Sequence, residues 1–109
     1  MKKAFFRLRT IAIEFPSGVI FGIAELEPIR SGWVVKIKGF TDFEGEDGME
    51  QAIGIASQTT QKIAGWLDGE VELWDVIEVF DREDEATQAG IENQNLAIYH
   101  LDTGKLKWL

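Results

Sequence analysis

Apolar segments broken by turn residues run through the N-terminal part of the chain. Residues 4 to 40 are rich in Phe, Ile and Val, and they are interrupted at Pro16-Ser17-Gly18 and again between residues 28 and 32. Aromatic and β-branched residues favour strands, whereas clusters of Pro, Gly and Ser mark turns. We therefore predict a meander of three antiparallel strands, the first of which lies between residues 4 and 15.

The third of these strands shows the clearest alternation. Trp33, Val35 and Ile37 take one face, and Lys36 and Lys38 take the other. Such alternation is typical of an antiparallel sheet with one buried and one hydrated face. We expect the two lysines to face solvent and the three apolar side chains to belong to the core.

The hydrophobic period changes at Met49 and predicts an amphipathic helix over residues 49 to 67. Asp47, followed three residues later by Glu50, fits a capping box at the start of this helix, and Gly69 suits a left-handed ending. The expected buried stripe, with steps of four and three residues, consists of Met49, Ile53, Ala56, Thr60, Ile63 and Leu67.

The C-terminal part of the chain predicts strands joined by a long loop. Residues 71 to 80 fit a helix face as well as a strand, and their density of Val, Ile and aromatic side chains favours the strand. Residues 81 to 95 are polar, so we predict a loop with room for a short helical turn. Residues 96 to 101 and 105 to 109 flank Asp102-Thr103-Gly104, a turn with glycine where positive φ is needed, and this predicts a β-hairpin.

Together these elements predict an α+β fold in a single domain over residues 1 to 109. The antiparallel sheet would hold the three-stranded N-terminal meander and further strands ending in the C-terminal hairpin, with the helix packed on one face. The helix would then cover Trp33, Val35 and Ile37. A length of 109 residues is close to the commonest size of a single domain with one core.

The composition excludes several kinds of site. There is no cysteine, which removes disulfides, thiolate nucleophiles and thiolate metal sites. Arg7 and Arg9 interrupt the apolar start of the chain and no small-residue cleavage site follows, so we expect no signal peptide. The longest apolar run, residues 19 to 24, is far shorter than the roughly 20 residues of a membrane-spanning helix. We expect a cytoplasmic protein.

Charge is distributed unevenly along the chain, whose formal net charge is −8. Residues 1 to 39 hold seven Lys or Arg against three Glu, whereas residues 40 to 85 hold two against fourteen Asp or Glu. A negative field repels nucleic-acid phosphates and anionic lipids, and it attracts basic proteins in a salt-dependent way. We therefore expect a basic protein partner, no nucleic acid and no membrane.

The sequence contains no segment with the residue spacing of a calcium-binding loop or of a nucleotide-binding loop. Carboxylates alternate at Asp42, Glu44 and Glu46 as in a calcium loop, but Asp47 stands where the turn glycine is required and Ile53 where the closing Glu is required. A hydrated turn before a helix explains this segment better. No glycine-rich phosphate loop occurs. We expect no metal and no cofactor.

His100 is the only histidine, so no two-histidine zinc site can form. A general base needs a nucleophile or an orienting carboxylate close by, and the nearest carboxylate in sequence, Asp102, belongs to the predicted turn. We expect a structural role for His100, no catalytic residue and no enzymatic activity.

The remaining surface residues predict a binding protein. The run from Asp81 to Glu85 places four carboxylates in five positions, which suits either a hydrated loop or a docking patch for a basic partner. Trp66 lies beside the helix stripe and Trp108 near the end of the last strand, and tryptophan is common at interfaces. The predicted partner-binding residues are Asp42, Glu44, Glu46, Asp81, Glu83, Asp84, Glu85, Trp66 and Trp108.

Three functional hypotheses follow. The first is a small acidic, non-catalytic protein-binding domain: an inhibitor, an immunity-type protein or an adaptor. The second is a self-associating structural subunit that forms a homodimer through the exposed edge of the C-terminal hairpin. The third, an enzyme or a carrier of a small ligand, requires a pocket with converging polar groups, and a cavity lined by Tyr99, His100 or buried carboxylates would favour it.

Overall fold

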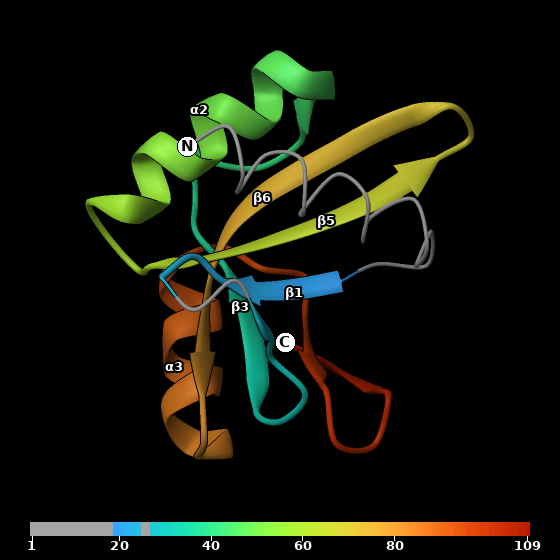
Figure 1. The fold of residues 1–109 in the computed structure, drawn as a ribbon. Coiled ribbons are helices and arrows are strands. Elements are labelled where there is room, and N and C mark those ends of the chain that lie inside the picture. Colours follow the sequence, from blue (N-terminus) through green and yellow to red (C-terminus); the bar gives the residue numbers. More distant parts are fainter. Residues whose placement is uncertain (1–18, 25–26) are drawn as a thin grey trace.

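The structure is a computed structural model that describes residues 19 to 24 and 27 to 109 (Figure 1). The predicted first strand, between residues 4 and 15, lies outside the described residues. None of the helices in these ranges is long and apolar enough to span a membrane. In chain order, the described elements are β1 (Val19–Gly22), β2 (Glu27–Pro28), β3 (Trp33–Lys36), β4 (Phe43–Glu44), α2 (Gly45–Ser57), β5 (Lys62–Asp68), β6 (Val71–Phe80), α3 (Glu83–Glu92), β7 (Ala97–His100) and β8 (Lys105–Trp108).

All the described strands belong to one antiparallel sheet, in the order β2-β1-β5-β6-β3-β7-β8, with β4 also paired to β6. The long strand β6 joins two halves of this sheet. Its residues 71 to 76 pair with β5, and its residues 77 to 80 pair with β3. The chain therefore has the predicted α+β fold, and β3 is separated from β1 by β5 and β6.

The two helices cover the same side of the sheet, α2 over one half and α3 over the other (Figure 1). Side chains alternate along a strand, so Trp74, Val76 and Phe80 of β6 share a face. Trp74 and Val76 pack under α2, and Phe80 packs in the cluster under α3. The cluster under α2 consists of Phe21, Met49, Ala52, Ile53, Ala56, Ile63, Trp74 and Val76.

The predicted helix exists, but its predicted end is wrong. Helix α2 ends at Ser57, and residues 62 to 68 form the strand β5. Gln61, between the two elements, has a φ of 65°, which is the left-handed region that interrupts a helix. Gly69 also has positive φ, but it serves the tight turn between β5 and β6.

The predicted capping box is also wrong. Helix α2 begins at Gly45, two residues before Asp47, and Glu44 at the cap position makes no side-chain capping bond. Glu46 and Asp47 instead lie in the first turn, where their negative charge is favourable beside the positive end of the helix dipole.

The predicted strand over residues 71 to 80 is confirmed as β6, and the predicted loop over residues 81 to 95 is wrong because it contains α3. The helix buries only Ala86 and Gly90, so it has no apolar stripe that a periodic search can detect. Three carboxylates in its first turn, Glu83, Asp84 and Glu85, favour its N-terminus.

The covering of β3 differs from the expectation. Trp33 and Val35 pack in the cluster under α3, and only Ile37 packs against the cluster under α2. Lys36 and Lys38 are exposed, as predicted.

The C-terminal hairpin is confirmed as β7 and β8, with Gly104 at a φ of 70° in the turn.

Candidate functional site

Large apolar side chains are exposed on the C-terminal hairpin. Of the eight exposed large hydrophobic residues in the described part of the chain, five lie between residues 96 and 109. Four of them line one region, which we call the hairpin patch: Leu96, Tyr99, Leu106 and Trp108, which are 82%, 39%, 54% and 72% exposed. Contiguous exposed apolar side chains make this region a candidate interaction surface.

The patch faces away from α3. Ile98 of β7 packs against Ala86 of α3, so its neighbour Tyr99 points to the opposite face of the sheet. Tyr99 pairs with Leu106 across the hairpin, and Trp108 lies two residues further along β8 on that same face. Three members of the patch therefore lie side by side, one on β7 and two on β8.

The outer edge of β8 is open, because no strand among the described residues pairs with it. The backbone N–H of Leu109 donates to the carbonyl oxygen of Leu96 at 2.9 Å. Hydrogen-bonded residues alternate along an antiparallel pair, so Lys107 also directs its backbone groups to β7. Leu106 and Trp108 then direct their N–H and C=O groups to the open edge.

Lys107 of β8 does not protect this edge. Lys107 lies on the α3 side, where its Nζ donates to Thr87 Oγ1 at 2.8 Å and lies 3.6 Å from Glu83 Oε2. Lysines usually discourage edge pairing by projecting into the space that a new strand would occupy. The contacts with Thr87 and Glu83 hold the Lys107 ammonium over its own helix instead.

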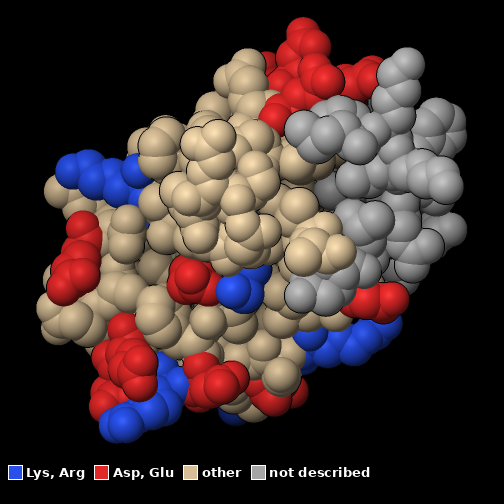
Figure 2. Space-filling model, turned by 60° about the vertical axis from the view of Figure 1, so that its left-hand side comes forward, with Lys and Arg blue, Asp and Glu red and all other residues tan. Residues whose placement is uncertain are grey.

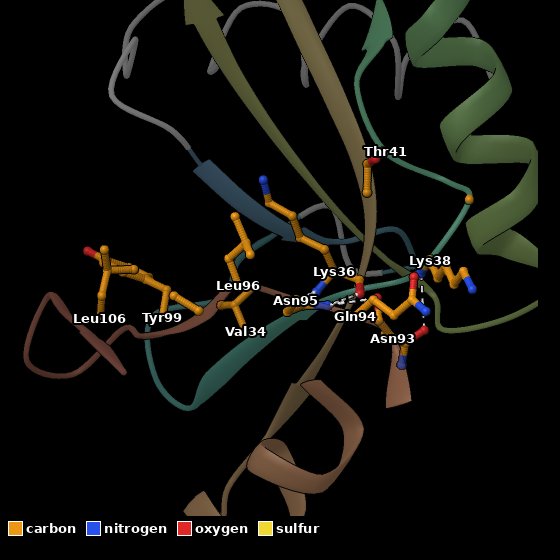
Figure 3. A pocket seen from close by; sticks show the side chains of 12 residues that line it. Val34, Lys36, Lys38, Thr41, Asn93, Gln94, Asn95, Leu96, Tyr99 and Leu106 are labelled. Atoms are coloured by element: carbon orange, nitrogen blue, oxygen red, sulfur yellow. Dashed lines mark hydrogen bonds between the residues drawn. The ribbon is translucent and has the colours of Figure 1, made fainter. Parts of the chain in front are cut away.

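A groove of about 530 Å³ lies beside the hairpin patch on the same face (Figure 3). Tyr99 and Leu106 lie toward one end of the view, and Lys38 lies with Asn93 at the other. Val34, Lys36 and Leu96 lie between the two ends. The groove thus has an apolar end and a basic end, and it meets one condition of the third hypothesis because Tyr99 lines it.

Two asparagine side chains shape the basic end of the groove. β7 pairs only with Trp33 and Val34 of β3, so the next part of β3 lacks a strand partner on that side. Asn95 replaces it: Oδ1 accepts from the Lys36 N–H at 2.9 Å, and Nδ2 donates to the Lys36 carbonyl at 2.8 Å. The Lys38 N–H donates to Asn93 Oδ1 at 3.1 Å.

The exposed Lys36 also forms an ion pair with a buried carboxylate. Its Nζ lies 3.3 Å from Oδ2 of Asp75, which is fully buried, and 4.8 Å from the ring centroid of Trp66. The other carboxylate oxygen of Asp75 accepts from the Asp42 N–H at 2.7 Å. Burial raises the pKa of Asp75, and the Asp42 N–H and Lys36 partly offset that increase. Trp66 is therefore partly covered by a lysine of its own chain.

The predicted acidic residues do not form one patch. Glu44 pairs with Leu73 near the start of β6, whereas Asp81 follows the end of β6. Eight residues of extended strand separate these positions, or about 26 Å along β6. On the face that Figure 2 shows, acidic side chains lie in separate groups, with basic side chains among the groups at the lower edge.

Basic side chains of the same chain partly neutralise the acidic residues at the start of α3. Arg82 contacts Asp84 at 2.7 and 3.0 Å and lies 3.6 Å from Glu85. The hydrogen bond from Arg82 holds the pKa of Asp84 below its usual value. Glu83 faces Lys107. The docking of a basic partner on these residues stays a prediction, and of the nine predicted residues only Trp108 belongs to the hairpin patch.

His100 has more partners than the sequence indicates. Its Nε2 lies 3.1 Å from Asp102 Oδ1, its Nδ1 lies 2.9 Å from Thr103 Oγ1, and its ring stacks on Trp33 at 4.2 Å. Asp102 Oδ1 also accepts a hydrogen bond from the Gly32 N–H at 2.8 Å. This hydrogen bond is the main cause that lowers the pKa of Asp102, and the electrostatic interaction with His100 lowers it further. An orienting carboxylate thus lies beside His100, which was not expected from the sequence.

This histidine network fastens the hairpin turn to the residue before β3. His100 lies on the face opposite Tyr99, so it does not line the groove. Within the described ranges, no group of three or more His, Asp or Glu side chains is placed to hold a metal ion. Comparisons with protein-family models, with curated proteins and with solved structures gave no match.

Proposed function

We propose that the protein is a non-catalytic association domain that pairs with a second copy of itself along the outer edge of β8. The observation that carries this proposal is the position of the hairpin patch. Exposed Leu106 and Trp108 stand on the strand whose backbone groups are unpaired at the edge of the described sheet. Pairing with another strand would satisfy those backbone groups and bury both side chains.

A two-fold axis at Lys107 gives the best register. Leu106 then faces the partner's Trp108, and Trp108 faces the partner's Leu106, so the residues with outward backbone groups meet and can form four hydrogen bonds. Cross-strand pairs of aromatic and aliphatic residues stabilise a sheet. Lys107 stands opposite the partner's Lys107, but each ammonium is directed toward Glu83 of its own chain.

Salt separates this proposal from docking on a basic protein. Each copy carries a formal charge of −8, so two copies repel each other until salt screens the repulsion. Apolar burial then stabilises the dimer. Self-association should therefore tighten as salt rises, whereas binding of an acidic surface to a basic partner should weaken.

Sedimentation velocity over a concentration series, at low and raised salt, tests the proposal. We expect a reversible dimer whose dissociation constant falls with salt and rises at least about tenfold in Leu106→Lys and Trp108→Gln. Val71→Lys is the control, because Val71 is also exposed and apolar but lies beside the turn between β5 and β6, in the half of the sheet that does not contain β8. A monomer under all conditions, or equal weakening by the control, overturns the proposal.

A further inference from the structure

None of the described residues that line the groove beside the hairpin patch is a carboxylate. The chain has 19 Asp and Glu against 11 Lys and Arg, yet in the part of the chain that the structure describes the charged residues that line the groove are Lys36 and Lys38. The local charge of the groove therefore has the opposite sign to that of the whole molecule. At physiological salt, charges further away than about 8 Å are largely screened. The Asp75 carboxylate lies 3.3 Å from Lys36 Nζ and offsets its charge, so Lys38 supplies the uncompensated positive charge of the groove.

The two lysines differ in what they can offer a ligand. Lys36 shares its charge with the buried Asp75. Lys38 is exposed and makes no ion pair with a described residue, and its backbone is held in place by Asn93. Lys38 is therefore a cation on a fixed backbone with a side chain that is free to meet an anion.

The opposite end of the groove is apolar. Tyr99 and Leu106 form a cross-strand pair there, and Val34 and Leu96 continue the lining toward Lys36 (Figure 3). A volume of about 530 Å³ lies within the range of pockets for small ligands. Hydrogen bonds from the backbone N–H groups of Lys36 and Lys38 to Asn95 and Asn93 hold this part of the groove in place without a ligand. Binding then loses less conformational entropy.

We infer that this groove binds a small amphipathic anion, a carboxylate carried on an aliphatic or aromatic body. The carboxylate lies at Lys38, and the body lies along Leu96, Tyr99 and Leu106. A cation of the same length lacks a partner at the basic end, and a short carboxylate lacks the apolar contacts. This inference does not rest on self-association.

Isothermal titration calorimetry with decanoate tests it, with decylammonium and acetate as matched ligands. The Trp108→Gln protein is used, because it lacks one of the two apolar side chains that would form the dimer and keeps the residues that line the groove. We expect saturable binding of decanoate, at least about tenfold weaker binding of decylammonium, and no measurable binding of acetate.

Two lysine variants localise the site. Lys38→Gln should weaken decanoate at least about tenfold. Lys105→Gln removes an exposed lysine on the other face of β8 and should leave binding unchanged. Amide chemical shifts should move at Lys36, Asn95 and Tyr99. Absent binding, equal binding of decylammonium, or equal effects of the two variants overturns the inference.

Discussion

Replacing Gly65 by alanine should destabilise the domain, because a tryptophan ring occupies the space of the new methyl group. Gly65 of β5 pairs with Trp74 of β6. A Cβ atom at Gly65 would lie 2.4 Å from Cζ3 and 2.6 Å from Cε3 of that ring. Carbon atoms in contact are usually about 3.5 to 4.0 Å apart, so the overlap exceeds about 1 Å.

Close packing around the Trp74 ring prevents it from shifting to make room for the new methyl group. Trp74 is fully buried and packs in the cluster under α2, which includes Met49 and Ile53. Overpacking of a core lowers the free energy of unfolding by about 1 to 3 kcal/mol. Replacing glycine by alanine also lowers the entropy of the unfolded chain, which raises the free energy of unfolding by about 0.4 to 1 kcal/mol. The expected net loss is about 1 to 2 kcal/mol, or a fall in Tm of roughly 4 to 10 °C.

Thermal and urea unfolding followed by circular dichroism measure this loss. Gly54→Ala is the matched control, because Gly54 lies inside α2 with nothing within 4 Å of a new Cβ. Alanine is the better helix former by about 1 kcal/mol, so the control should raise Tm. If Gly65→Ala melts at or above the parent temperature, the packing of Trp74 against β5 is not as described.

Two further predictions concern the core. Ile53→Asp, at a position that is 1% exposed under α2, should abolish the cooperative melt, and an unchanged melt would contradict the packing of that helix. Asp75→Asn should change the pH dependence: burial raises the pKa of Asp75 in the folded state above its ordinary 3.8, so its contribution to stability falls as pH rises above that value. In urea unfolding, the free energy of unfolding of the variant should therefore rise relative to that of the parent as pH increases from acid to neutral. A difference that does not change with pH would contradict the raised pKa of Asp75.

The strands were predictable where local composition was decisive. β6 is dense in Val, Ile and aromatic residues, and the hairpin of β7 and β8 flanks a turn that ends in Gly104. The helix pattern failed beyond Ser57 because Ile63 continues its spacing while sitting on a strand. Ile63 of β5 packs in the same cluster as the buried residues of α2. The sequence spacing of these residues therefore resembles the buried face of one longer helix. Helix α3 escaped prediction because Ala86 and Gly90 are too small to mark a buried face.

The candidate site was predictable only in part. The exposure of Trp108 and the open edge follow from its place at the end of a hairpin. The groove does not follow, because it depends on Asn95 reaching Lys36 across 59 positions of sequence. The carboxylates of residues 42 to 46 and 81 to 85 looked continuous along the chain, but β6 separates them in space. Contacts between distant residues, rather than composition, decide both outcomes.

Because β6 runs through both halves of the sheet, we expect the described part of the chain to unfold as one cooperative unit. This strand supplies backbone partners to β5 along one part of its length and to β3 along the other, so each helix rests on a layer that shares the same central strand. Disrupting the middle of β6 would remove support from both helices at once. Neither half could then melt alone while the other kept its full set of ladder bonds, and heat should dismantle the two layers together.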